Sequence, residues 1–193
     1  MDFTGEYEIP APRDKVWEAL NDAEVLKQCI DGCEELDKES DTEFSAKVTA
    51  KVGPVKAKFT GKVSLSDIDP PNGYTISGEG QGGVAGFAKG GATVKLTDGG
   101  SGTVLQYQAN AEVGGKLASV GSRLVEGVAK KTADDFFGKF VEIVSSDDEA
   151  TRLEDSELVS DVKTDEDSGG LSPLVWGAGI VVIVVILLYI FAG

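Results

Sequence analysis

The chain has 193 residues and a formal net charge of −15, with 33 acidic residues, 18 lysines and arginines, and no histidine. This charge excludes nucleic-acid binding through phosphate neutralisation and fits a salt-loving host. Without His the chain lacks the commonest metal ligand, the usual general base and any Ser-His-Asp triad. Cys29 and Cys33 cannot complete a four-ligand zinc site. We therefore expect no metal, no catalytic residue and two free, structural thiols, a redox role being the alternative.

The N-terminal residues predict one strand followed by two short helices. Residues 3–9 alternate apolar and polar side chains as a strand does, and Pro10 and Pro12 end the pattern. Helices are predicted over 11–20 and 23–29, with Asp22 as the N-cap of the second. A weak strand over 34–38 follows.

Five further strands are predicted, separated by turns rich in glycine and proline; they cover residues 44–52, 55–65, 74–80, 87–96 and 103–113. Such regular alternation favours an antiparallel sheet with one buried face. The inward positions are mostly small: Ala46, Ala50, Ala57, Gly61, Ala88, Gly90, Ala92, Ala109 and Ala111. Because interiors are close-packed, either the covering helix approaches very closely or an apolar ligand fills the space. We favour the ligand.

A long helix is predicted over residues 116–144. Its apolar stripe comprises Leu117, Val120, Leu124, Val128, Phe136, Phe140 and Val144. Close packing on the sheet is the favoured explanation for Gly121, Gly127 and Gly138 within it, with a hinge or ligand access as alternatives. Strands followed by one long helix give an α+β, START-like helix-grip fold for residues 1–144.

The C-terminal part predicts a tether and a membrane anchor. Residues 145–170 hold ten acidic side chains against Arg152 and Lys163, which is typical of an unstructured linker. Residues 174–191 are uninterruptedly apolar, or glycine, and at 1.5 Å per residue span roughly 27 Å. We predict a single transmembrane helix within 171–193, a buried core helix being the alternative. Since residues 1–20 do not resemble a signal peptide, we expect a cell-membrane protein with a cytoplasmic body.

Four segments resemble the CoxG family, named for the G subunit of carbon monoxide dehydrogenase, within the START-like polyketide-cyclase (SRPBCC) superfamily. They are VWEALNDAEVLKQCIDGCEEL at 16–36, VGPVKAKFTGKVSL at 52–65, GFAKGGATVKL at 86–96 and VGGKLASVGSRLVEGVAKKTADDFFGKF at 113–140. The resemblance covers residues 3–144, and a C-terminal membrane segment also occurs in the family. One departure is Asp31, where the family usually has Pro in a Cys-Ile-Pro-Gly-Cys turn; this residue could loosen the turn.

The resemblance implies a non-enzymatic accessory protein for a molybdenum hydroxylase of the xanthine oxidase type. Such proteins are thought to bring the enzyme to the membrane and to pass electrons to respiratory quinone. START-like domains typically hold a lipid or another apolar ligand between sheet and helix. We therefore expect no covalent cofactor, and a bound quinone or lipid in a cavity lined by Trp17, Phe59, Phe87, Ala92, Tyr107, Ala109, Leu117, Val120, Leu124 and Val128.

The polar side of the predicted sheet carries seven lysines: Lys47, Lys51, Lys56, Lys58, Lys62, Lys89 and Lys95. A solvated face with lysines that protect sheet edges is one interpretation. The other is a docking patch for anionic lipid or for an acidic partner enzyme.

Two other functions remain open at this point. The body could act only as a recruitment anchor, with its cavity filled by side chains. It could also be a START-like cyclase or hydrolase, although the absence of His counts against that chemistry.

Overall fold

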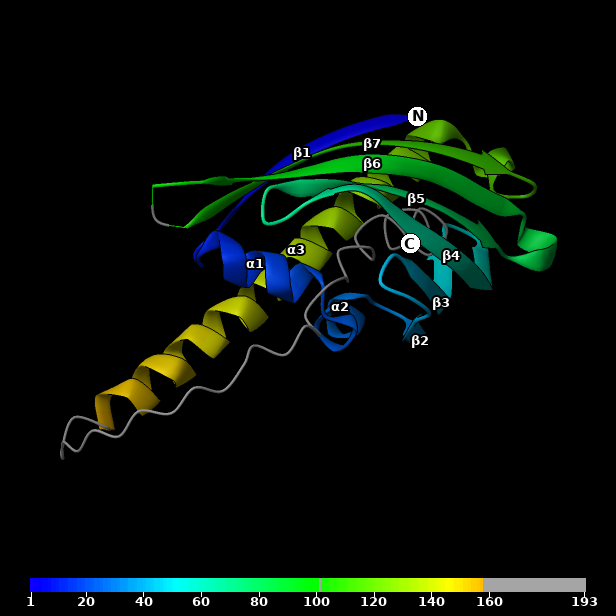
Figure 1. Cartoon of the computed structure of the whole chain (residues 1–193). Helices are drawn as coiled ribbons and strands as arrows, with labels where there is room; N and C mark the ends of the chain where they lie inside the picture. The colour runs from blue at the N-terminus through cyan, green and yellow to red at the C-terminus, as the bar shows by residue number, and fades with distance from the viewer. Residues whose placement is uncertain (101, 158–193) are drawn as a thin grey trace.

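The computed structural model describes residues 1–100 and 102–157, which form a curved antiparallel sheet folded around a long C-terminal helix (Figure 1). The strands are β1 (Asp2–Ile9), β2 (Cys33–Lys38), β3 (Glu43–Val52), β4 (Val55–Asp69), β5 (Gly73–Gln81), β6 (Phe87–Asp98) and β7 (Thr103–Gly114). Their order across the sheet is β1-β7-β6-β5-β4-β3-β2, so that β1 and β2 are the edges. This arrangement confirms the α+β prediction and is consistent with a START-like fold.

Two short helices, α1 (Arg13–Leu20) and α2 (Ala23–Cys29), connect β1 to β2. The predicted N-cap at Asp22 is confirmed, since its carboxylate accepts hydrogen bonds from the backbone N–H groups of Glu24 and Val25. Helix α1 begins later than predicted because Pro12 occupies its N-cap position with a ψ of 147°.

The start of the C-terminal helix differs from the prediction at residue 116. A short 3-10 turn, η2 (Ala118–Val120), comes first, and α3 (Ser122–Glu157) begins only after Gly121. Gly121 has a φ of 99°, which α-helical residues do not adopt, so the helical repeat that begins at Leu117 cannot continue through it. The buried stripe of α3 is therefore Val125, Ala129, Ala133, Phe136, Phe137, Phe140 and Val144.

The end of α3 also differs from the prediction. The helix continues to Glu157, through the first half of the segment 145–170 that was expected to be an unstructured linker. Residues 145–157 contain neither Gly nor Pro, so no residue there interrupts the helix. Residues 158–170 and the predicted span lie outside the described residues. Within the described part of the chain, no helix combines the length and apolar character needed to cross a bilayer.

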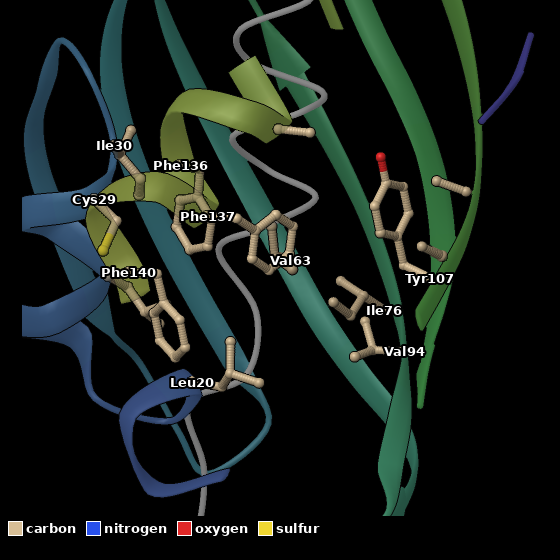
Figure 2. Packing of buried hydrophobic residues seen from close by; sticks show 14 of the residues in the cluster. Leu20, Cys29, Ile30, Val63, Ile76, Val94, Tyr107, Phe136, Phe137 and Phe140 are labelled. Carbon is tan, nitrogen blue, oxygen red and sulfur yellow. The ribbon is translucent and has the colours of Figure 1, made fainter. Parts of the chain in front are cut away.

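The core lies between the concave face of the sheet and α3. Phe136, Phe137 and Phe140 project from α3 toward side chains of the strands, and each is at most 1% exposed (Figure 2). They lie among the small inward residues: Ala46, Ala50, Ala88, Ala92, Ala109 and Ala111 are all buried. The aromatic side chains of α3 and the small residues of the strands thus belong to one hydrophobic core.

The predicted close packing on the sheet does not account for the glycines inside α3. A Cβ built at Gly127 or Gly138 would meet no atom of the described residues within 4 Å, apart from the backbone of the helix itself. Close packing on the sheet is therefore wrong as their explanation, and nothing in the structure requires Gly at either position.

Candidate ligand-binding site between β1 and α3

A cavity of about 480 Å³ lies between the edge strand β1 and helix α3. Strand β1 contributes Phe3, Gly5 and Tyr7, and α3 contributes Ala129 and Asp134. Tyr107 of β7, Glu6, Glu126 and Lys130 are also among its lining residues. The volume falls within the range of small-molecule sites. Asp2 and Thr4 complete the lining, so that apolar and aromatic surface lies beside four carboxylates and one lysine.

Tyr7 joins the two walls of this cavity. Its hydroxyl donates a hydrogen bond to Asp134 Oδ1 at 2.8 Å, and its ring stacks on Phe137 with centroids 4.0 Å apart. Burial, together with the hydrogen bond to Asp134, raises the pKa of Tyr7 above its ordinary value. The hydroxyl therefore stays protonated at physiological pH and remains a donor.

Tyr107 reaches the cavity because its cross-strand partner is a glycine. Gly5 pairs with Tyr107 in the β1–β7 ladder, and a Cβ on Gly5 would lie 2.3 Å from the ring atom Cε1. The ring thus lies across the place that a side chain at position 5 would occupy. Burial and then the negative charge of Asp134 raise the pKa of Tyr107, so this hydroxyl is also protonated at physiological pH.

The cavity offers aromatic faces and hydroxyl donors. The rings of Tyr7, Tyr107 and Phe137 lie nearly parallel, with interplanar angles of 8° to 25°. Flat apolar molecules stack on such faces, and a tyrosine hydroxyl can donate to a carbonyl oxygen. No group of three or more potential metal ligands occurs in the described part of the chain. The cavity therefore presents aromatic rings and a tyrosine hydroxyl next to the charged groups of Glu6, Glu126, Lys130 and Asp134.

The predicted cavity residues fall into several groups. Phe59, Ala92, Tyr107, Ala109 and Leu117 are buried, as expected, and Tyr107 is the member of this set that lines the β1–α3 cavity. Trp17 is half-buried on α1, where its ring packs 5.4 Å from that of Tyr74.

Phe87 faces the opposite side of the sheet from the predicted one. Residues Ala88 and Ala92 of β6 are buried, so the odd-numbered positions of this strand point outward. The ring of Phe87 instead covers its cross-strand partner, Gly114, where a Cβ would lie 2.2 Å from its Cε1 atom.

Val120, Leu124 and Val128 do not form the predicted buried stripe. Leu124 is 43% exposed, and the other two are half-buried. The break at Gly121 places Val120 before the helix. Leu124 and Val128 lie within α3, each one residue and so about 100° of helical rotation from the core-facing Val125 and Ala129.

Tyr7 and Asp134, which line the cavity, and Phe137, on which the Tyr7 ring stacks, were not predicted as site residues. Alternation in β1 places Phe3, Gly5 and Tyr7 on one face, and Asp134 and Phe137 are three residues apart, on one side of α3. Both signals were present in the sequence. However, nothing local to β1 and α3 shows that these two elements are neighbours.

The seven lysines of the predicted docking patch are mostly matched by carboxylates. Lys47 pairs with Glu35 and Lys58 with Glu34, both at 2.5 Å, and Lys89 pairs with Glu112 at 3.3 Å. Lys62 lies opposite Glu79 in the β4–β5 register. Hydrogen bonding to Glu35 raises the pKa of Lys47, and Lys58 lowers the pKa of Glu34. The convex face therefore alternates in charge over most of its area.

Lys51, Lys56 and Lys95 complete the predicted patch. Lys51 and Lys56 lie directly opposite each other in the β3–β4 hairpin, whereas Lys95 lies opposite Gly73. No carboxylate partner for these three lysines occurs among the described residues.

The turn between the two cysteines is held in place rather than loosened. Asp31 forms an ion pair with Lys139 of α3, and the backbone N–H of Thr49 donates to the carbonyl oxygen of Gly32 at 2.9 Å. Both thiols are free; burial raises the pKa of Cys29 to about 12 and that of Cys33 to about 11. Such thiols are poor nucleophiles at neutral pH, which favours a structural role.

Taken together, the curved antiparallel sheet and the covering helix define a small α+β domain, with a cavity between its edge strand and that helix. The model of the CoxG family, the G subunit of carbon monoxide dehydrogenase, matches residues 5–145. The chain therefore belongs to the CoxG family. The family's description associates it with carbon monoxide dehydrogenase as an accessory protein.

Solved structures agree with this assignment. A conserved protein from Geobacillus kaustophilus is 33% identical, with a TM-score of 0.71; the match covers 76% of this chain and 96% of that one. A protein from Rhizobium leguminosarum is 16% identical with a TM-score of 0.59, covering 76% and 95% of the two chains. A protein from Thermus thermophilus is 18% identical with a TM-score of 0.58, covering 76% and 98%. The latter two support the fold alone. The comparison with curated proteins finds no match.

Proposed function

We propose that the protein brings a molybdenum hydroxylase of the carbon monoxide dehydrogenase type to the membrane and carries an apolar ligand, respiratory quinone being the leading candidate. Family membership over residues 5–145 supports the association with the enzyme. The apolar segment 174–191 supports a single-pass anchor in the cell membrane, with residues 1–144 on the cytoplasmic side.

The cavity between β1 and α3 is the observation that carries the ligand part of the proposal. A quinone ring is flat and bears two carbonyl acceptors. The faces of Tyr7 and Tyr107 can contact the ring, and the Tyr107 hydroxyl can donate to a carbonyl oxygen. The apolar tail would follow the groove past Phe3 and Ala129, because the aromatic side chains of α3 fill the centre of the core. The body itself would perform no bond chemistry.

A recruitment anchor without a ligand is the second candidate, and the burial of the inward-facing alanines favours it. The small inward residues that suggested a large internal cavity, Ala92 and Ala109 among them, are at most 7% exposed. In this function the cavity would hold only water.

Native mass spectrometry of the full chain, purified in detergent from a quinone-containing host, tests the ligand. The carrier proposal expects a bound mass equal to that of the host quinone. A different lipid would retain the carrier class and replace quinone as its cargo. A chain that remains empty after quinone is added would support recruitment alone.

Two matched variants locate the ligand. Tyr107→Phe keeps the ring and removes one donor, so quinone affinity should fall about 2- to 10-fold. Tyr74→Phe is the control, because the Tyr74 hydroxyl is buried without a hydrogen-bond partner, away from the residues that line this cavity. Equal affinities for the two variants would contradict a head-group site at Tyr107.

A further inference from the structure

Three connections meet at one end of the sheet, which we call the loop end. They are the β3–β4 turn around Gly53, the β5–β6 connection with its 3-10 turn η1 (Gly83–Ala85), and the β7–α3 connection with η2. The two 3-10 turns lie together at the right-hand end of Figure 1, where α3 begins.

Direct contacts hold these connections together. The backbone N–H of Leu117 donates to the carbonyl oxygen of Ala85 at 3.2 Å. A Cβ on Gly53 would lie 3.0 Å from Leu124 Cδ2 and 3.7 Å from Val120 Cγ1. The loop end is therefore one continuous surface rather than three separate loops.

Large apolar side chains are exposed at this end. Among the described residues the exposed large hydrophobics are Ile68, Val84 and Leu124, at 37%, 85% and 43%. Val84 and Leu124 both belong to the loop end. Val84 projects from η1, and the adjacent Gly83 has a positive φ of 59°.

The charge of the loop end has the opposite sign to that of the whole chain. Its segments 51–57, 80–88 and 113–125 contain Lys51, Lys56, Lys116 and Arg123 and no Asp or Glu. All four basic side chains are exposed. The chain as a whole carries −15, and Glu79, Glu112 and Glu126 directly flank these segments, so the basic character is confined to the tip of this end.

One pair of these lysines is arranged unfavourably for the isolated molecule. Lys51 and Lys56 lie directly opposite each other in the β3–β4 ladder, and like charges in that position repel. Along the same hairpin, Lys47 and Lys58 each have a glutamate partner. An anionic surface in contact with the hairpin tip would remove the repulsion.

We propose that the loop end contacts an anionic lipid bilayer, with Val84 and Leu124 entering the interface and the four basic side chains lying among the headgroups. Apolar side chains flanked by Lys and Arg are the features that membrane-surface segments use. Stable protein interfaces bury about 1,600 Å² around aromatic or Arg anchors, whereas this end presents two separate aliphatic side chains. The contact goes beyond the proposed function and does not require the C-terminal segment to span the membrane.

Hydrogen exchange of the full chain tests the proposal. The chain is mixed with excess vesicles of phosphatidylglycerol and phosphatidylcholine in equal parts, or of phosphatidylcholine alone. Segments 82–88 and 114–124 should exchange more slowly with the anionic vesicles, and high salt should remove this protection. Co-sedimentation with the same vesicles separately reports whether the C-terminal segment anchors the chain.

Charge variants supply the controls. The double variant with Lys51→Gln and Lys56→Gln should need about 10- to 30-fold more anionic lipid for half-maximal protection. Val84→Asp should abolish protection. Lys95→Gln removes the same kind of exposed charge from β6, opposite Gly73 and away from the loop end, and should have no effect. If the chain co-sediments with the vesicles but its loop end has the same hydrogen-exchange rate with both vesicle types, the proposal is overturned. The proposed function would remain intact. Protection that appears only when the partner enzyme is added would instead assign the surface to a protein.

Discussion

The hydroxyl of Tyr7 donates to Asp134 Oδ1 at 2.8 Å and so links the first strand to the last helix across 127 residues of sequence. Strand β1 is an edge of the sheet and pairs with β7. The bond therefore stabilises the position of α3 over this edge, beside the candidate ligand cavity. Both residues of this hydrogen bond line the cavity.

Tyr7→Phe should lower the free energy of unfolding by about 0.5–1.5 kcal/mol, because it removes one hydrogen bond and keeps the ring stacked on Phe137. A double-mutant cycle with Asp134→Ala, followed by chemical denaturation, isolates the bond from other effects. A coupling energy near zero would show that the bond does not stabilise the native state.

Gly5→Ala should destabilise the fold by about 1–3 kcal/mol, because the new methyl group would overlap the ring of Tyr107. Gly138→Ala is the matched control, since a methyl group there meets no atom and favours the helix by about 1 kcal/mol. Thermal denaturation should give shifts of opposite sign. Shifts of the same sign would mean that the packing around Tyr107 is misplaced.

Ala109→Phe should lower stability by about 1–3 kcal/mol, because Ala109 is 7% exposed within a core that already contains large aromatic side chains. On the sequence alone, this change would block a ligand and leave the fold intact. Measurement of both stability and quinone affinity separates the two. A variant of unchanged stability that no longer binds quinone would indicate an open internal cavity instead.

Alkylation of both cysteines by iodoacetamide should be slow at neutral pH and should accelerate tenfold per pH unit in the alkaline range, Cys33 reacting before Cys29. The reason is that burial raises their pKa values to about 11 and about 12, from an ordinary 9.0. Mass spectrometry of the native and the urea-unfolded protein gives the two rates. Equal rates in both states would show that the thiols are accessible.

The same two pKa shifts predict a loss of stability in alkali. Since the folded-state pKa values lie above those of the unfolded chain, ionisation of the thiols favours unfolding. The stabilising contribution is complete below about pH 9 and is lost as the pH rises toward 11 to 12. Replacement of both cysteines by Ala should remove this part of the pH dependence.

Lys139→Met should destabilise the protein by about 0.2–1 kcal/mol at low salt, because the ion pair with Asp31 is half-exposed. The difference from the parent protein should shrink as salt is added. Lys131→Met serves as the control, since Lys131 pairs with Asp135 within one helix and ties no other element to α3. Because Lys131 also feels the charge of Asp31, Lys89→Met is the second control: its ion pair with Glu112 joins β6 to β7, away from the turn. If Lys139→Met has no larger effect than Lys89→Met, the pair does not hold the Cys29–Cys33 turn.

The sequence by itself determined the strands, the N-cap at Asp22 and the sheet's buried face, because these depend on the alternation of side chains along a strand and on neighbours within a few residues. It also carried the family resemblance, which the match over residues 5–145 confirms. The inward positions of Ala92, Tyr107 and Ala109 follow from the same two-residue period.

Only the tertiary structure decided the phase of α3 and the site that it forms. Gly121 has a positive φ, so the apolar residues before it do not belong to α3. Within α3, packing on the sheet buries Val125 and Ala129 rather than Leu124 and Val128. The hydrogen bond of Tyr7 with Asp134 joins residues 127 positions apart in the chain. The ion pairs of Glu35 with Lys47 and of Glu34 with Lys58 join two different strands in each case. Such contacts depend on how whole elements pack against one another, and local sequence patterns do not encode that packing.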